Sequence, residues 1–398
     1  MRAPVIATFI AFTCLTTVPS LADVRISRGF VPVEENVKLT EFVGPLAFPW
    51  GMAALPDGLL LITQRDGYIR VVENGKLLDK VIDFPVDVFT SRVNPAGGEM
   101  RGQGGLLDIV ISPDFENDKL LYFSYAKGSL DDNRTAIGRA TWTGQGLDDF
   151  EEIFSVSKGK RDGQHFGSRL AFLSDGTLLA TIGDGGNPPL DLLDTLVREQ
   201  AQNLQSYFGT VIRINPDGSV PEGNPFVDLA GAKPEIWSFG HRNAQGIVVD
   251  PESGAVWSSE HGPLGGDELN RVEKGKNYGW PRVTYGRDYR DASVITARIE
   301  GPAFSDPSIA WVDTHAPGGL HLYTGSAFSD WKGDLLSAGL ASRDIRRIKM
   351  EDGKVVGETR IPLGTTRVRG FAQTPDGTLY VVTDGAEGRV LRLDPSEE

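Results

Sequence analysis

Several short polar segments carry residue types that could bind a ligand or move a proton. In residues 102–105, glycines let the backbone approach a ligand closely, and Gln103 can both donate and accept hydrogen bonds. On its own, such a segment is more typical of a tight turn. His165 lies in a second segment, and a histidine can act as a general base near neutral pH. A single histidine is more often a hydrogen-bonded core residue, so its place in the fold decides between the two interpretations.

Two arginine-containing segments indicate where an anion could bind. Arg242 is a bidentate donor for carboxylates, and the adjacent Asn243 adds a directional contact. Arg367 and Arg369 are separated by one residue, so strand alternation places both guanidinium groups on one face. Two neighbouring like charges repel unless an anion or a carboxylate compensates them. The alternatives are a structural ion pair for Arg242 and two surface arginines at a sheet edge.

Residues 259–268 contain a Gly262-Pro263 step with several carboxylates close by. Backbone carbonyl groups exposed by such a step, together with carboxylates, suit a hard, oxygen-seeking cation such as Ca²⁺. The spacing does not match an EF-hand loop, and His261 is an alternative ligand. The five histidines of the whole chain argue against a histidine-rich transition-metal site.

These segments stand next to a repeated unit that must position them. An apolar run, a turn rich in Ser, Pro, Asp and Gly, and a second β-rich run recur six times, starting at Met52, Ile109, Leu170, Ile247, Ala327 and Phe371. Each copy is typical of a hairpin, because the turn residues reverse the chain and β-branched residues favour strands. The repeats predict an all-β fold, a six-bladed β-propeller with four-stranded antiparallel blades. A β-sandwich is the alternative, and residues 191–202 are the best helical candidate.

The charge balance narrows the classes of partner. The chain carries 54 Asp and Glu against 40 Lys and Arg, a net charge of -14. No broad positive field is available for a polyanion, so nucleic acid and anionic membrane surfaces are not expected partners. A small anionic ligand needs only a local arginine cluster.

The first residues are typical of a secretory signal. Arg2 supplies a positive start, residues 5–18 are apolar and almost uncharged, and small residues at 20 and 22 suit cleavage before Asp23. A buried N-terminal helix or a membrane anchor is the alternative, but the stretch is short for a membrane span. We expect a periplasmic or secreted protein with two segments, a signal peptide at 1–22 and one propeller domain at 23–398.

Taken together, the segments resemble the soluble quinoprotein glucose/sorbosone dehydrogenases, most closely the aldose sugar dehydrogenase branch. The resemblance covers nearly all of the mature chain, and its motifs lie at residues 48–51, 102–107, 165–169, 181–184, 242–246, 260–263, 267–268, 277–281 and 367–369. It implies a propeller that binds pyrroloquinoline quinone (PQQ) and Ca²⁺ at its axis. The implied reaction is oxidation of an aldose at the anomeric carbon to a lactone, with electrons passing to an external acceptor.

The resemblance also implies roles for individual residues. His165 resembles the catalytic base, and Gln103 resembles the residue beside the substrate hydroxyl and the quinone. Arg242 resembles a cofactor ligand that also orients the quinone. Other positions that resemble cofactor-binding or pocket-lining residues are Asn243, His261, Tyr289, Ala316, Pro317, Gly318, Arg367 and Arg369. The implied metal ligands are the carbonyls of Gly262 and Pro263 for a cofactor-side Ca²⁺, and Glu268 with the Tyr278 carbonyl for a further Ca²⁺.

The chain departs from the glucose dehydrogenase pattern at three positions. Ala341 stands where those enzymes carry a lysine, Gln164 replaces an acidic residue, and His261 replaces a glutamine. These differences favour a looser aldose range over strict glucose preference. Two alternative functions stay open, a Ca²⁺-dependent hydrolase such as a propeller lactonase and a non-catalytic binding propeller.

Overall fold

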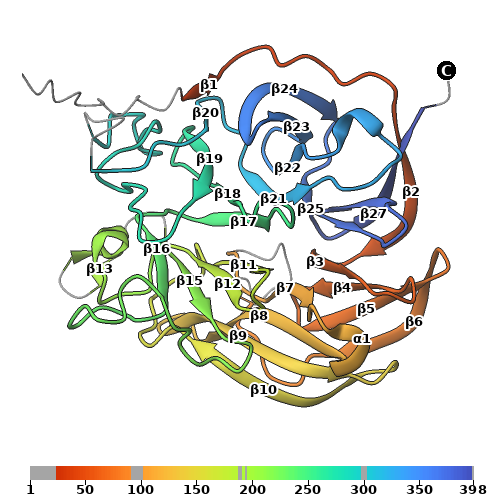
Figure 1. Ribbon diagram of the computed structural model, residues 1–398, viewed down its shortest axis with the longest axis horizontal. Coiled ribbons are helices and arrows are strands. Elements are labelled where there is room, and N and C mark those ends of the chain that lie inside the picture. Colours follow the sequence, from red (N-terminus) through yellow and green to blue (C-terminus); the bar gives the residue numbers. More distant parts are fainter. Residues whose placement is uncertain (1–23, 91–101, 187–190, 193–194, 297–302, 397–398) are drawn as a thin grey trace, which may run out of the picture.

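The computed structural model of the chain describes residues 24–90, 102–186, 191–192, 195–296 and 303–396. Six antiparallel sheets stand in a ring around a central axis (Figure 1), so the predicted six-bladed β-propeller is confirmed. The predicted signal peptide lies outside the described residues. None of the helices in the described part of the chain is long and apolar enough to cross a bilayer.

Blades 1 to 3 are built from consecutive segments, and the strands of each blade follow one another from the axis outward. Blade 1 contains β3 (Pro49–Ala54), β4 (Leu60–Gln64), β5 (Tyr68–Glu73) and β6 (Lys76–Asp83). Blade 2 contains β7 (Leu106–Ile111), β8 (Leu120–Gly128), β9 (Asn133–Trp142) and β10 (Leu147–Ser155), with the short helix α1 (Phe115–Asp118) between its first two strands. Blade 3 contains β11 (Gly167–Phe172), β12 (Leu178–Ile182), β15 (Thr210–Ile214) and β16 (Ile236–Phe239).

Blades 4 to 6 complete the ring. Blade 4 contains β17 (Ala244–Val249), β18 (Val256–Glu260), β19 (Asp267–Val272) and β20 (Ile309–Trp311), and β1 (Arg25–Ser27) adds a parallel edge strand. Blade 5 contains β21 (Pro317–Leu322), β22 (Leu335–Gly339), β23 (Asp344–Glu351) and β24 (Lys354–Pro362). Blade 6 contains β25 (Val368–Gln373), β26 (Leu379–Thr383) and β27 (Gly388–Pro395), with β2 (Val37–Leu46) as its outermost strand.

The chain closes the ring by pairing its beginning with its end. The early strand β2 runs antiparallel to the last strand β27, with Val37 opposite Pro395 and Leu46 opposite Gly388. In Figure 1 the red strand β2 therefore lies beside the dark blue strand β27. Blade 6 is thus made from both ends of the sequence, which removes the two open edges of an unclosed ring.

The hydrophobic core is divided among the six contacts between neighbouring blades. Leu61 of blade 1 and Phe123 of blade 2 are fully buried in one such cluster, and Trp257 and Leu335 are buried between blades 4 and 5. Similar clusters fill the remaining contacts. Packing between blades, rather than one central core, fixes the inner strands around the axis.

Three inner strands end at Asp-Gly turns, as the repeats predict. Gly58, Gly176 and Gly377 have φ angles of +88°, +81° and +89°, a region that glycine adopts without strain. The preceding aspartate accepts a hydrogen bond from the residue after the glycine, as Asp57 does from the Leu59 N–H at 3.2 Å. These turns send each chain back to the rim from which its inner strand started.

The six inner strands share an irregularity at their first residues. Each shows a register shift against its neighbour, for example between Gly167 and Leu170 in β11 and between Val368 and Gly370 in β25. Such bulges bend a strand and change the direction of its side chains. Because the inner strands all begin at the same end of the axis, the bulges gather at one rim.

Two predicted elements differ from the structure. The fifth repeat does not begin with a strand at Ala327, because the inner strand of blade 5 is β21 and a 3₁₀ helix, η2 (Ser329–Trp331), fills the connection to β22. Phe328 and Trp331 stack there at 4.0 Å, so their apolar character reflects a packed connection. The helix predicted over 191–202 is a 3₁₀ helix, η1 (Val197–Gln202), preceded by a small hairpin of β13 (Asp191–Leu192) and β14 (Thr195–Leu196).

Candidate active site

Residues from two kinds of position meet at the rim where the inner strands begin. The first kind precedes an inner strand, as Gln103 precedes β7 and Arg242 precedes β17. The second kind follows the second strand of a blade, as Asp184 follows β12 and Asp384 follows β26. Since these strands are antiparallel, the start of one lies beside the end of the other. Side chains from different blades therefore converge on one end of the axis.

His165 and Asp184 form a buried pair in blade 3. His165 Nδ1 lies 2.6 Å from Asp184 Oδ1, and the two side chains are 5% and 1% exposed. Asp184 Oδ2 accepts a hydrogen bond of 2.8 Å from Trp280 Nε1–H. When Nδ1–H donates to the carboxylate, the lone pair of a neutral imidazole is on Nε2, which has no hydrogen-bond partner among the described residues. The pair can therefore accept a proton at Nε2.

The surroundings keep the His165 imidazole neutral. Burial lowers the pKa of His165; Asp184 opposes this shift, and the nearby Arg242 and Lys160 add to it. Burial alone would raise the pKa of Asp184, but His165, Arg242 and Trp280 outweigh burial and hold this pKa below its ordinary value. At neutral pH the pair is a neutral imidazole beside an ionised carboxylate. His165 also has a φ of 49°, which is a strained backbone conformation for any residue other than glycine. Such strained conformations recur at functional sites.

Gln103 and Arg242 flank this pair. Gln103 Oε1 accepts a hydrogen bond of 2.9 Å from the His165 backbone N–H, so the two predicted site residues are in direct contact. Arg242 Nη1 donates to the Gly262 carbonyl oxygen at 2.6 Å, and its guanidinium lies 5.3 Å from the centre of the Trp280 ring. The predicted base, amide and arginine, which come from three blades, are thus brought together at the rim.

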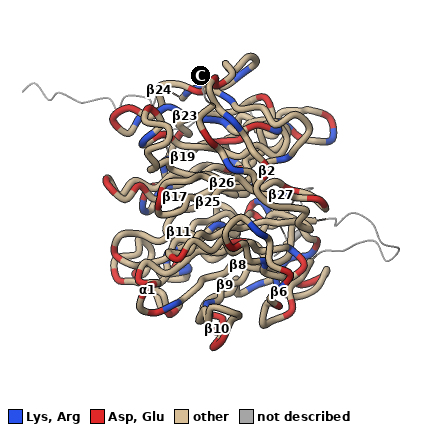
Figure 2. The backbone as a smooth tube through the Cα atoms, turned by 90° about the vertical axis from the view of Figure 1, so that its right-hand side faces the viewer, with Lys and Arg blue, Asp and Glu red and all other residues tan. Residues whose placement is uncertain are grey.

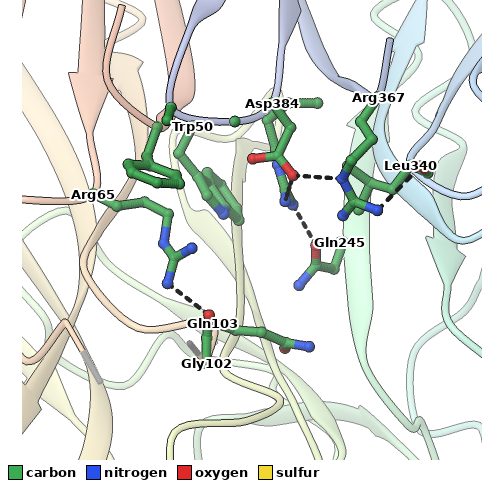
Figure 3. A pocket seen from close by; sticks show the side chains of 12 residues that line it. Trp50, Arg65, Gly102, Gln103, Gln245, Leu340, Arg367 and Asp384 are labelled. Carbon is green, nitrogen blue, oxygen red and sulfur yellow. Dashed lines mark hydrogen bonds and ion pairs between the residues drawn. The ribbon is translucent and has the colours of Figure 1, made fainter. Parts of the chain in front are cut away.

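A cavity of about 420 Å³ opens at the same rim (Figure 3). Its walls combine aromatic, amide and charged side chains, namely Phe48, Trp50, Arg65, Gly102, Gln103, Gln245, Leu340, Arg367, Arg369, Asp384, Gly385 and Ala386. The Arg369 guanidinium lies 5.6 Å from the centre of the Trp50 ring. A flat aromatic surface and several guanidinium groups make this cavity suitable for a planar anion.

Asp384 is the carboxylate that compensates the predicted arginine pair. Its Oδ2 atom lies 3.0 Å from Arg367 Nε and 3.1 Å from Arg369 Nη2. Arg369 is buried, whereas the Arg367 side chain is 47% exposed, so the two differ in their access to solvent. Burial lowers the pKa of Arg369, and Asp384 opposes that shift. One carboxylate shared by two guanidinium groups leaves a net positive charge in the cavity.

Two buried donors at this end of the axis have no hydrogen-bond partner among the described residues. They are Asn243 Nδ2 and Arg369 Nε. The Asn243 Oδ1 atom is fixed, because it accepts a hydrogen bond of 3.1 Å from the Gly167 N–H. A buried donor without a partner costs about 1–3 kcal/mol, and a ligand with acceptor oxygens would remove this cost. Arg369 lines the cavity and Asn243 lies outside its lining, so a polycarboxylate such as PQQ fits the donors at this end of the axis.

The predicted turn at residues 316–318 lies at the start of β21, and hydrogen bonds from neighbouring segments fix its position. The Ala316 N–H donates to Asp267 Oδ2 at 2.7 Å, and the Pro317 carbonyl oxygen accepts a hydrogen bond of 2.8 Å from His261 Nε2. The Gly318 carbonyl oxygen accepts one of 2.7 Å from a buried arginine of blade 3. These contacts place the turn and His261 at the working rim. Neither Tyr289 nor the turn lines one of the two rim cavities, but Tyr289 differs from the turn because it is 51% exposed.

The predicted metal ligands gather around a second, narrower cavity. Gly262, Glu268 and Tyr278 line it together with Glu260, whereas Pro263 lies outside the lining. Burial raises the pKa of Glu268 well above its ordinary value, and the Glu260 carboxylate raises it further. Within the described ranges, no three His, Cys, Asp and Glu side chains are arranged to hold a metal ion. A Ca²⁺ ion in this cavity would therefore need backbone oxygens as well.

Three residues of the rim carry no predicted role from the sequence. Asp184 orients His165, Asp384 pairs with both arginines, and Arg65 lines the cavity. Each comes one or two residues after the second strand of a repeat, in blades 3, 6 and 1. The signal that could have revealed them is a charged residue at this one position of several repeats, whereas the predicted site residues lie mainly before the inner strands.

A sequence profile of the Glucose / Sorbosone dehydrogenase family matches residues 46–392. The chain belongs to this family. Among other members, it is 44% identical over 362 residues to an uncharacterized protein of Synechocystis sp., covering 91% of this chain and 87% of that protein. It is 35% identical over 370 residues to the aldose sugar dehydrogenase YliI of Escherichia coli, covering 92% and 94%.

Solved structures of this dehydrogenase family have the same architecture. The crystal structure of the soluble aldose sugar dehydrogenase of Escherichia coli, in its apo form, matches with a TM-score of 0.81 and 33% identity, covering 90% of this chain and 99% of that one. The PQQ-bound form of the aldose sugar dehydrogenase of Streptomyces coelicolor matches with a TM-score of 0.68 and 28% identity, covering 92% and 99%. The resemblance to a sugar dehydrogenase family is thus confirmed.

Proposed function

We propose that the chain is a PQQ-dependent aldose sugar dehydrogenase, which oxidises aldoses at the anomeric carbon to lactones. The observation that carries this proposal is the pairing of an oriented, neutral His165 with a cavity rich in arginine at the same rim. A base alone would suit many reactions, and an anion site alone would suit a binding protein. Their combination suits a reaction in which a sugar loses a proton while an anionic cofactor is held beside it.

In this proposal, His165 Nε2 accepts the proton of the anomeric hydroxyl. Asp184 keeps Nδ1 protonated and stabilises the imidazolium that forms. Gln103 holds the His165 backbone through its Oε1 atom and presents its amide group beside the base. When bound, PQQ would supply an acceptor for the anomeric hydride, a chemistry that amino-acid side chains do not provide.

The residues that would hold the cofactor are those with unused donors. Arg367 and Arg369 would bind its carboxylates, and Arg242 and Asn243 would contact it from the side of blade 4. Arg242 would also orient the quinone and stabilise negative charge that develops there. His261 and residues 316–318 would form the neighbouring wall, and Tyr289 would contribute only from the solvent side.

We further propose two Ca²⁺ ions. The carbonyl oxygens of Gly262 and Pro263 would hold the ion beside the cofactor, since a carbonyl that already accepts from Arg242 keeps a second lone pair. Glu268 and the Tyr278 carbonyl would hold the other. The buried Asn270 Oδ1 atom, which has no hydrogen-bond partner among the described residues, is a further oxygen near these carboxylates. A divalent cation would relieve the cost of burying Glu268 next to like charge.

Export and the electron acceptor complete the proposal. Cleavage of residues 1–22 would release the mature protein to the periplasm or the medium, where an external acceptor would reoxidise the cofactor. Acidic and basic residues alternate along the backbone of the propeller (Figure 2), so a partner that depends on a large uniform field is not expected.

The test is a reconstitution assay with the purified mature chain, PQQ, Ca²⁺, a panel of aldoses and a dye acceptor. Dye reduction that requires both aldose and PQQ supports the proposal, with lactone as the product. Lactone hydrolysis that requires Ca²⁺ but no PQQ would establish the hydrolase instead. Tight sugar binding without any turnover would indicate a non-catalytic propeller.

A further inference from the structure

Arg65 occupies an unusual position at the cofactor end of the axis. It follows β4, and its side chain points into the cavity between Trp50 and Gln103 (Figure 3). Only 7% of the residue is exposed. Burial lowers its pKa to about 10, and the positive charge of Arg369 contributes to this shift. Arg65 is therefore a charged guanidinium held inside the protein near another guanidinium.

The Arg65 guanidinium forms hydrogen bonds through only two of its three nitrogens among the described residues. Arg65 Nε donates to the Gly104 carbonyl oxygen at 2.9 Å, and Nη2 donates to the Gly102 carbonyl oxygen at 2.7 Å. The third nitrogen, Nη1, makes no hydrogen bond to any described residue. No carboxylate of a described residue lies within ion-pair distance of Arg65. A buried charge without an ionic partner is costly, so this geometry favours an anionic partner from outside the chain.

The two carbonyls that Arg65 holds flank Gln103. The close fit continues in the backbone, because a Cβ atom on Gly105 would lie 2.3 Å from the Arg65 carbonyl oxygen. Gln103 in turn accepts a hydrogen bond from the backbone of His165. Arg65 thus connects the cavity to the segment that supports the proposed base.

We propose that Arg65 is a fourth cofactor-binding arginine, beside Arg242, Arg367 and Arg369. It would bind a carboxylate of the cofactor through Nη1 while its other nitrogens fix the loop of Gln103. This inference rests on the proposed function for the identity of the ligand. Arg367 and Arg369 share Asp384 with each other, whereas Arg65 has no such partner among the described residues. Asp384 and Asp66 act on the Arg65 charge only from beyond ion-pair distance, whereas Asp384 contacts the other two arginines of the cavity directly.

The experiment measures PQQ affinity by calorimetry in Ca²⁺ buffer for the wild type, Arg65→Met and Arg70→Met. Arg70, on the neighbouring strand β5, lies outside the cavity and is the matched control. Loss of one charge-assisted contact predicts an affinity about 10- to 100-fold weaker for Arg65→Met and an unchanged affinity for Arg70→Met. The trimethyl ester of PQQ lacks the carboxylate charges, so it should bind Arg65→Met and the wild type almost equally.

The outcomes separate this inference from the proposed function. A wild-type chain that does not bind PQQ overturns the proposed function. A wild-type chain that binds PQQ, together with an Arg65→Met variant of equal affinity, overturns the role of Arg65 alone. A loss that is equally large for the ester shows that Arg65 only supports the loop. If Arg65→Met does not fold, Arg65→Lys is measured, because the single nitrogen of lysine cannot reproduce the planar fork that reaches both carbonyls and a carboxylate. Wild-type affinity in that variant also overturns the role.

Discussion

Blades 3 and 5 place a histidine at the same point of the repeat, and the two histidines have different surroundings. His165 and His315 each lie two residues before an inner strand, and each approaches a carboxylate. Asp184 lies two residues after the second strand of blade 3, and Asp344 is the first residue of the third strand of blade 5. In blade 5, His315 Nδ1 lies 2.7 Å from Ser342 Oγ and Nε2 lies 2.9 Å from Ser337 Oγ. In blade 3, only Nδ1 is used.

The comparison teaches that position in the repeat is not sufficient for chemistry. Blade 4 offers a related case one position earlier, where His241 lies three residues before β17, between Ser238 Oγ at 2.9 Å and Oε1 of Glu260, the last residue of β18, at 3.0 Å. Two of the three histidines thus have both ring nitrogens satisfied by the protein and serve packing. Of these three histidines, His165 alone has an Nε2 atom without a hydrogen-bond partner among the described residues. The proposed base therefore resembles the structural histidine of blade 5, but its Nε2 atom lacks the hydrogen-bond partner that His315 has.

The largest expected effect is that of removing the free nitrogen. His165→Gln should lower kcat by about 10²- to 10⁴-fold, the usual contribution of a general base, while PQQ still binds. Dye-linked turnover and calorimetric PQQ binding are measured on the same preparation. His321→Gln is the control, because His321 lies near the end of β21 that is far from the working rim. This variant should keep the wild-type turnover. Normal turnover in His165→Gln would remove this residue as the base.

The next effect tests the carboxylate that orients His165. Asp184→Asn should lower kcat by about 10- to 100-fold, because the imidazole loses the partner that fixes its tautomer. Since Asp184 raises the pKa of His165, the acid limb of the kcat/KM profile should also move to lower pH. Trp280→Phe removes the hydrogen bond to Asp184 Oδ2 and should cost much less. An acid limb that stays in place in Asp184→Asn would contradict the pairing.

The equivalent change in blade 5 should affect stability instead of catalysis. His315→Leu leaves the Ser337 hydroxyl without its partner, which should lower the free energy of unfolding by about 1–3 kcal/mol. Urea unfolding measures this loss, and turnover per PQQ-binding site should stay at the wild-type level. The double variant His315→Leu/Ser337→Ala should recover part of the stability. A stable His315→Leu protein with lost turnover would make the two histidines functionally alike.

The smallest effect concerns the pH dependence. Activity should be present above the pKa of His165 and be lost as the pH falls through that pKa. Because burial lowers the pKa of His165, this loss should occur at a lower pH than for an ordinary histidine. Burial lowers the pKa of Lys160 to about 7, so it is charged in this acid range and lowers the pKa of His165. Lys160→Met should therefore move the acid limb to higher pH, by about one unit or less. Lys158→Met, at an exposed neighbouring position, should leave the profile unchanged.

The sequence predicted the scaffold well because its signal is local. Asp-Gly turns and the strands beside them lie within a dozen residues, so blades 1, 3 and 6 are visible in the sequence. The repeat predicted for blade 5 was assigned to the wrong residues, because the inner strand of this blade, residues 317–322, is followed by a long packed connection instead of a short turn. The pairing of β2 with β27 has no local signal, since it joins the two ends of the chain.

The candidate site was predicted in part for the same reason. Arg367 and Arg369 are conspicuous because they are close in sequence, and the need for a compensating charge follows from their spacing. The identity of that charge, Asp384, depends on how β25 and β26 pair. The free Nε2 atom of His165 and the unpaired Nη1 atom of Arg65 result from three-dimensional packing, which the spacing of residues in the sequence does not predict.

The closure of blade 6 has a consequence for the order of events during synthesis. Arg367, Arg369 and Asp384 lie on a blade whose outer strand, β2, is made early and whose other strands are made last. Blades 1 to 5 can form as the chain emerges, but blade 6 must wait until both of its parts are present. The arginine side of the cavity is therefore completed only when the whole chain is available. If the chain is exported, as proposed, in an unfolded state, the arginine side of its cavity would form only after translocation.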